Sequence, residues 1–171
     1  LKEKIEGLRK SGKGKKEGIR KESMQAVIIG KTRTGKSSLI SLLTNANPEI
    51  SRSEEAMFTT KYPIIGMMSF AGTSIQLIEN PAIESEFYDK GLTNSADTLL
   101  LLITDFNQIA EIEKELGKTN AKRIIVFNKI DSLSENEARK ISAKLQSKKY
   151  NFVLISTKTK QGTSDFTRET V

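Results

Sequence analysis

The chain has 171 residues, 36% of them hydrophobic and 29% charged, and this is enough for one domain with a proper core. It contains no cysteine, which excludes disulfides, thiolate catalysis and zinc–sulfur sites. It contains no histidine, so any general base must be a carboxylate or the substrate itself. No apolar run approaches the ~20 residues of a membrane span, and the charged first stretch lacks the apolar segment of a signal peptide. We therefore expect a cytoplasmic protein without a membrane partner.

The net charge of +7 is unevenly distributed along the chain. Residues 1–23 contain nine Lys/Arg and four Glu, a net charge of +5, whereas the rest of the chain carries +2. In this arm Leu1, Ile5 and Leu8 recur at helical spacing, and the Gly- and Lys-rich residues 11–18 are typical of a linker. A basic arm favours a polyanion partner, but it is equally consistent with a solvated tail.

From Met24 onward, predicted strands and helices alternate. Apolar runs predict strands at residues 25–29, 62–70, 74–78, 98–103, 123–127 and 151–155. Helices are expected at 38–43, at 109–116 and from a capping box at Ser134 to about Ser147. Residues 44–55 and 79–95 have no clear period and are predicted to be irregular.

This alternation predicts an α/β fold with two units, a basic arm (1–23) and a domain (24–171). We expect a three-layer, doubly wound sheet of six strands, mostly parallel, with one antiparallel edge strand from the hairpin around residues 71–72. Loops that bind a ligand then gather at the carboxyl ends of the strands. A last covering helix is expected to begin near Thr163 and Ser164, and we expect the domain to continue past Val171.

The turn between the first strand and the first helix matches G-x-x-x-x-G-K-[ST]. Its glycines let the backbone wrap around phosphates, and the successive N–H groups and the helix N-terminus attract anions. Lys36 should reach the β- and γ-phosphates, and the Ser37 hydroxyl should ligate Mg²⁺. The alternative is a plain glycine turn. The predicted phosphate-binding residues are Gly30, Thr32, Arg33, Thr34, Gly35, Lys36, Ser37 and Ser38.

A second motif, Asn128-Lys129-Ile130-Asp131, follows a buried strand 92 residues after Lys36. An Asp at this place can accept two parallel hydrogen bonds from guanine, and adenine offers no such pair of donors. Asn128 can brace the phosphate loop, and Lys129 can lie along the sugar. After the next strand, Ser156, Thr157 and Lys158 can offer an N–H to the base and pack over it. The combination predicts a site for a guanine nucleotide and argues against an ATPase.

With these motifs the chain resembles a Ras-like P-loop GTPase of the translation-factor-related class, in the Obg family. It is most similar to the developmentally regulated GTP-binding (DRG) proteins, without their inserted subdomain and TGS domain. Further resemblance lies in the arm and in two stretches, Phe58-Thr59-Thr60-x-x-Pro63-x-x-Gly66 and Ile75-Gln76-Leu77-Ile78-Glu79-Asn80-Pro81-Ala82-Ile83. The resemblance implies GTP or GDP with Mg²⁺ as ligands and a ribosome or structured RNA as a partner of the arm. We expect a monomer.

By this resemblance Thr60, with Thr59 as second choice, is the threonine that closes on Mg²⁺ and the γ-phosphate; a threonine simply entering a strand is the alternative. Glu79 and Ala82 stand where the family has Asp and Gly. Glu79 would face the metal with Ser37 and Thr60, but it is one methylene longer, and Mg²⁺ requires near-ideal octahedral geometry. Ile83 occupies the position of a catalytic Gln.

These departures predict slow GTP hydrolysis, and a binding module that does not hydrolyse GTP is the alternative. The predicted catalytic residues are Lys36, Thr60 and Arg33. Arg33 either folds over the phosphates as an arginine finger in cis or points to solvent.

Overall fold

The computed structural model describes residues 1–2, 4–5, 24–44, 61–70 and 72–163. The strands are β1 (Met24–Gly30), β2 (Ile64–Phe70), β3 (Thr73–Glu79), β4 (Thr98–Ile103), β5 (Lys122–Phe127) and β6 (Phe152–Leu154). The helices are α2 (Lys36–Leu43), α3 (Lys90–Ser95), α4 (Gln108–Leu116) and α5 (Glu135–Ser147), with a 3-10 turn, η2 (Ile130–Ser132).

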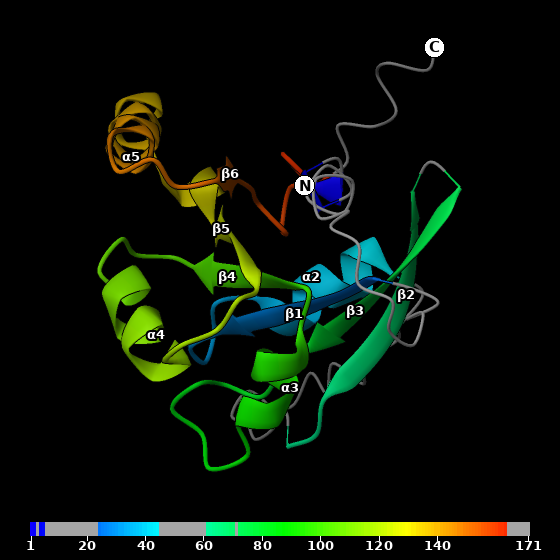
Figure 1. The fold of residues 1–171 in the computed structure, drawn as a ribbon. Helices are drawn as coiled ribbons and strands as arrows, with labels where there is room; N and C mark the ends of the chain where they lie inside the picture. The colour runs from blue at the N-terminus through cyan, green and yellow to red at the C-terminus, as the bar shows by residue number, and fades with distance from the viewer. Residues whose placement is uncertain (3, 6–23, 45–60, 71, 164–171) are drawn as a thin grey trace.

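The six strands form one sheet in the order β2-β3-β1-β4-β5-β6 (Figure 1). Within the described residues β2 and β3 pair antiparallel, and the other neighbouring strands pair parallel. All six residues of β4 are buried, as a strand covered on both faces requires. The predicted doubly wound sheet with one antiparallel edge strand is therefore confirmed.

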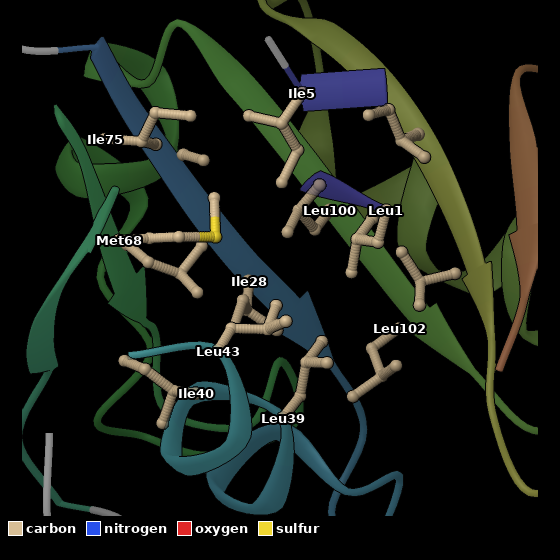
Figure 2. Packing of buried hydrophobic residues seen from close by; sticks show 14 of the residues in the cluster. Leu1, Ile5, Ile28, Leu39, Ile40, Leu43, Met68, Ile75, Leu100 and Leu102 are labelled. Carbon is tan, nitrogen blue, oxygen red and sulfur yellow. The ribbon is translucent and has the colours of Figure 1, made fainter. Parts of the chain in front are cut away.

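Each face of the sheet carries its own hydrophobic core. One face packs against α2 and against the first residues of the chain, and Figure 2 shows Leu1 and Ile5 in the same cluster as Leu100 and Leu102. Ile5 is fully buried, and its N–H donates to the Leu1 carbonyl at 3.1 Å. The predicted helical spacing of these two residues thus matches a buried turn, whereas Leu8 lies outside the described residues.

The other face is covered by α4 and α5, together with residues around α3. In α4, Ile109, Ile112 and Leu116 are buried, which matches their spacing along one side of a helix. The predicted capping box of α5 is present: the Glu137 N–H donates to Ser134 Oγ at 3.2 Å, and the Ser134 N–H donates to Glu137 Oε2 at 2.7 Å.

The prediction that residues 79–95 are irregular was partly wrong, because β3 extends to Glu79 and α3 spans Lys90–Ser95. This helix has one buried residue, Thr93, and so gives no apolar period. Its N-cap is Asp89, which accepts from the Leu92 N–H at 3.0 Å, and the buried Asn80 amide donates to the Asp89 carbonyl at 2.8 Å. These polar contacts fix the position at which α3 begins.

The described part of the chain ends at Thr163. Thr163 closes a turn, and the rest of the expected last helix lies outside the described residues. No helix in the described part of the chain combines the length and the apolar character that crossing a bilayer requires.

Candidate nucleotide-binding site

The phosphate loop joins β1 to α2 and depends on its two glycines. A Cβ at Gly35, where φ is +98°, would lie 2.4 Å from Asn128 Nδ2, and a Cβ at Gly30 would lie 2.5 Å from the Leu102 carbonyl oxygen. Neither position has room for a side chain, and the left-handed backbone of Gly35 also disfavours one. The loop is thereby held close to the ends of β4 and β5.

Lys36 is the first residue of α2, and its side chain is buried within the loop. Its ammonium donates to the Lys31 carbonyl at 2.9 Å. Burial lowers the pKa of Lys36, and the carboxylates of Glu79 and Glu84 act in the opposite direction. A buried cation beside loop N–H groups makes this part of the surface attractive to an anion.

Ser37, the next residue, meets Glu79 at the end of β3. Its hydroxyl lies 2.8 Å from Glu79 Oε1 and 3.1 Å from Oε2. Two of the three predicted metal ligands are therefore adjacent, and a hydroxyl and a carboxylate are the hard oxygen ligands that suit Mg²⁺. The third predicted ligand, Thr60, and its alternative, Thr59, lie outside the described residues. Ser38 is exposed on α2.

The tip of the loop is held by the second motif. Lys129 Nζ donates to the Arg33 carbonyl at 2.8 Å, and both residues have left-handed backbones with φ of +63° and +66°. The Arg33 side chain is exposed. This contact places the Lys129 stem across the loop, whereas the catalytic role of Arg33 stays a prediction.

Asn128 connects three strand ends. It is buried, its Nδ2 donates to the Thr34 carbonyl at 2.8 Å, and its Oδ1 accepts from the Thr157 N–H at 3.1 Å. The phosphate loop, the Asn128–Asp131 motif and the residues after β6 are consequently one continuous arrangement, as the sequence predicted for a shared site.

Asp131 lies in η2 with its side chain exposed, at the same edge of the sheet. The buried Ser156 hydroxyl donates to Asp131 Oδ1 at 2.7 Å and accepts from the Thr159 N–H at 3.1 Å. Ser156 therefore orients the carboxylate that was predicted to read guanine. Lys158 is exposed.

Sequence reasoning missed Glu84, which contacts the loop at Thr32. Its Oε1 accepts from the Thr32 N–H at 2.7 Å. Burial raises the pKa of Glu84, but the hydrogen bonds from Thr32 and the attraction of Lys36 outweigh it, and the net shift is downward. Glu84 comes 52 residues after Thr32, in a stretch without periodicity, so no local pattern could have indicated this contact.

Comparison with known proteins assigns the family. The family model described as "50S ribosome-binding GTPase" matches residues 25–129, more than half of the chain. The chain belongs to this GTPase family.

Related family members have a similar sequence over most of this chain. The mitochondrial tRNA modification GTPase MSS1 of Saccharomyces cerevisiae is 30% identical over 88% of this chain and 32% of its own length. GTPase Obg is 34% identical in Pelagibacter ubique and 32% in Prochlorococcus marinus, over 67% and 83% of this chain and 39% and 49% of those proteins. The chain thus spans about a third to a half of these relatives. The Obg part of the predicted resemblance is confirmed, and the special similarity to DRG proteins stays a prediction.

Solved structures agree on the fold. Era from Aquifex aeolicus bound to GDP and AlF4⁻ superposes with a TM-score of 0.68 at 17% identity, over 85% of this chain and 55% of that one. The bacterial selenocysteine-specific elongation factor EF-Sec gives a TM-score of 0.65 at 21% identity, over 85% and 27%. Identities this low support the fold alone, and the fold is that of a P-loop GTPase domain.

Proposed function

We propose that this chain is a guanine-nucleotide-binding domain that binds GTP and GDP with Mg²⁺ and hydrolyses GTP slowly. The observation that carries this proposal is the hydrogen bond from Asn128 Nδ2 to the Thr34 carbonyl. It joins the motif suited to phosphates to the motif suited to guanine, so that one ligand can contact both.

The phosphate end of the site supplies charge and directed N–H groups. The buried Lys36 ammonium would exchange its bond to the Lys31 carbonyl for the β- and γ-phosphate oxygens. Backbone N–H groups of the loop and of the first turn of α2 would add further donors. The residues assigned to this end are Gly30, Thr32, Arg33, Thr34, Gly35, Lys36, Ser37 and Ser38.

The base end selects guanine. Asp131, oriented by Ser156, would accept from N1–H and the 2-amino group, and the Lys129 stem would pack along the sugar. Thr157 and Lys158 would complete the pocket beside Asn128. A base without that pair of donors would leave the acceptor of Asp131 unpaired, which favours guanine over adenine.

Ser37 and Glu79 would hold Mg²⁺ together with Thr60. The side-chain oxygen atoms of Ser37 and Glu79 already lie next to each other. When bound, Mg²⁺ neutralises charge that develops on the phosphates. Lys36 and the loop N–H groups supply the remaining positive potential, and an arginine finger from Arg33 is a further proposed contribution.

Slow hydrolysis is proposed because the switch residues depart from the family pattern. The long Glu79 side chain already accepts the hydrogen bond of the Ser37 hydroxyl, the group proposed to bind Mg²⁺. Ile83 has no polar group that could orient the attacking water. Ala82 is not among the positive-φ residues of the described chain, so it fits this backbone without strain. The second candidate, a module that binds GTP without hydrolysing it, is favoured by the same Ser37–Glu79 contact.

The proposed setting is a monomer in the cytoplasm that contacts a ribosome or structured RNA. The basic arm (1–23) would make phosphate contacts, and the domain (24–171) would carry the nucleotide. Relatives support this setting: the matching family is described as ribosome-binding, and Era has been solved in complex with part of 16S ribosomal RNA.

The test is to measure GTP, GDP and ATP affinity with Mg²⁺ titrated, together with single-turnover hydrolysis. We expect Mg²⁺-dependent binding of both guanine nucleotides, no binding of ATP, and slow turnover. Lys36→Ala should abolish binding, whereas Lys118→Ala, at an exposed lysine away from the site, should not. Binding without turnover would favour the second candidate, and equal affinity for ATP would exclude the proposed function.

A further inference from the structure

We propose that Glu84 is an internal competitor for the nucleotide's phosphates, a residue that sets the affinity of the phosphate loop. This inference rests on the proposed function, because the loop must bind phosphate for Glu84 to compete. Its basis is the bond from the Thr32 N–H to Glu84 Oε1 at 2.7 Å.

The backbone places Glu84 at this contact. The residue before it, Ile83, donates its N–H to the Gly30 carbonyl at 3.0 Å, which attaches the segment to the first residue of the loop. Glu84 then lies inside a tight turn in which the Ser85 N–H donates to the Ala82 carbonyl at 2.8 Å. Glu84 is exposed, but two anchored peptide groups direct its carboxylate at the loop.

The carboxylate resembles a phosphate oxygen in charge and in its choice of partner. It accepts from a backbone N–H of the loop and lies within the electrostatic reach of the Lys36 ammonium. A bound phosphate would use donors of the same loop and carry negative charge close to Glu84. Because like charges at one concavity repel, phosphate binding favours withdrawal of Glu84.

With competition of this kind, the apparent affinity for the nucleotide equals the intrinsic affinity multiplied by the fraction of molecules in which Glu84 has left the loop. The Glu84 side chain can withdraw by rotation about its own torsions, while the turn from Ala82 to Ser85 keeps its backbone hydrogen bonds.

The experiment compares wild type with Glu84→Ala, Glu84→Gln and a matched control, Glu86→Ala, at an exposed glutamate two residues further on. Affinity for GppNHp, a GTP analogue, is measured by calorimetry. Hydrogen exchange at the Thr32 amide is measured by NMR on protein stripped of nucleotide. We expect Glu84→Ala to bind GppNHp about threefold to tenfold more tightly and to exchange the Thr32 amide faster. Glu84→Gln should tighten binding less, because it keeps an acceptor and loses the charge.

Unchanged or weaker GppNHp binding by Glu84→Ala overturns the inference, and so does unchanged exchange at Thr32. An equal gain in Glu86→Ala also overturns it, because the effect would then be one of general charge. Failure of the proposed function looks different: no variant, wild type included, would bind GppNHp. If wild type binds, Lys36→Ala does not, and Glu84→Ala equals wild type, the function stands and the role of Glu84 is excluded.

Discussion

The Ser37 hydroxyl shares its hydrogen between both oxygens of Glu79, at 2.8 and 3.1 Å. Replacing Glu79 by Asp shortens the side chain by one methylene and withdraws the carboxylate from this hydroxyl, which leaves room between them. We expect the Mg²⁺ concentration for half-maximal GTP binding to fall and single-turnover hydrolysis to rise, each by about threefold to tenfold, the equivalent of ~1 kcal/mol. Glu86→Asp is the control, and slower turnover in Glu79→Asp would contradict the explanation.

Asn128 should be the residue on which the integrity of the site depends most. Asn128→Ala removes the bonds to Thr34 and Thr157 and leaves a buried carbonyl and an N–H without their partners. We expect a loss of about 2 kcal/mol in the free energy of unfolding and weaker binding of GTP. Urea denaturation and calorimetry measure the two effects. Asn107→Ala, at an exposed asparagine that makes no side-chain cap, should change neither.

Asp131 should distinguish bases by the 2-amino group. Inosine lacks this group, so ITP would leave one acceptor of Asp131 unpaired, and we expect it to bind about tenfold more weakly than GTP. In Asp131→Ala the difference between the two nucleotides should disappear, while Glu135→Ala on α5 should preserve it. A preference for GTP that survives in Asp131→Ala would mean that another group reads the base.

The first turn of the chain should contribute to stability although it precedes the predicted domain. Ile5→Ala removes a fully buried side chain from the cluster under α2, and we expect a loss of about 2–4 kcal/mol in the free energy of unfolding. Lys2→Ala is the matched control on the same turn. Equal unfolding midpoints in urea for Ile5→Ala and wild type would show that this turn adds no stability.

Because Lys36 is buried, we expect the free energy of unfolding to depend on pH in the alkaline range. Burial holds its pKa in the folded protein below the ordinary value of 10.5. Between the folded pKa and 10.5 the unfolded chain binds more protons than the folded one, so stability rises with pH across this window. The free energy of unfolding of wild type, relative to Lys36→Met, should therefore increase with pH there. The control Lys118→Met, which keeps Lys36, should show the same increase relative to Lys36→Met. A decrease would mean that Lys36 is not desolvated.

The parts of the fold that could be predicted are those encoded locally. The six apolar residues of β4 and the Ser134–Glu137 box each contain their own signal, and both agree with the structure. Helix α3 could not be predicted, because Asn80 fixes Asp89 at its start through bonds between residues nine positions apart. The contact of Glu84 with the phosphate loop could not be predicted for the same reason. Its partner Thr32 comes close only after β1 and β3 have paired.

The order of the strands also fixes the length of the ligand. The phosphate loop follows β1 and the Asn128–Asp131 motif follows β5, with β4 alone between them. Two steps of ~4.8 Å place the two strand ends about 10 Å apart, a separation set by the backbone hydrogen bonds of the sheet. The sheet therefore sets the spacing between the strand end that precedes the phosphate loop and the strand end that precedes the guanine motif. Substitutions in the loops can change how tightly a ligand binds or which base it carries, but the distance between the two strand ends that carry the motifs stays the same.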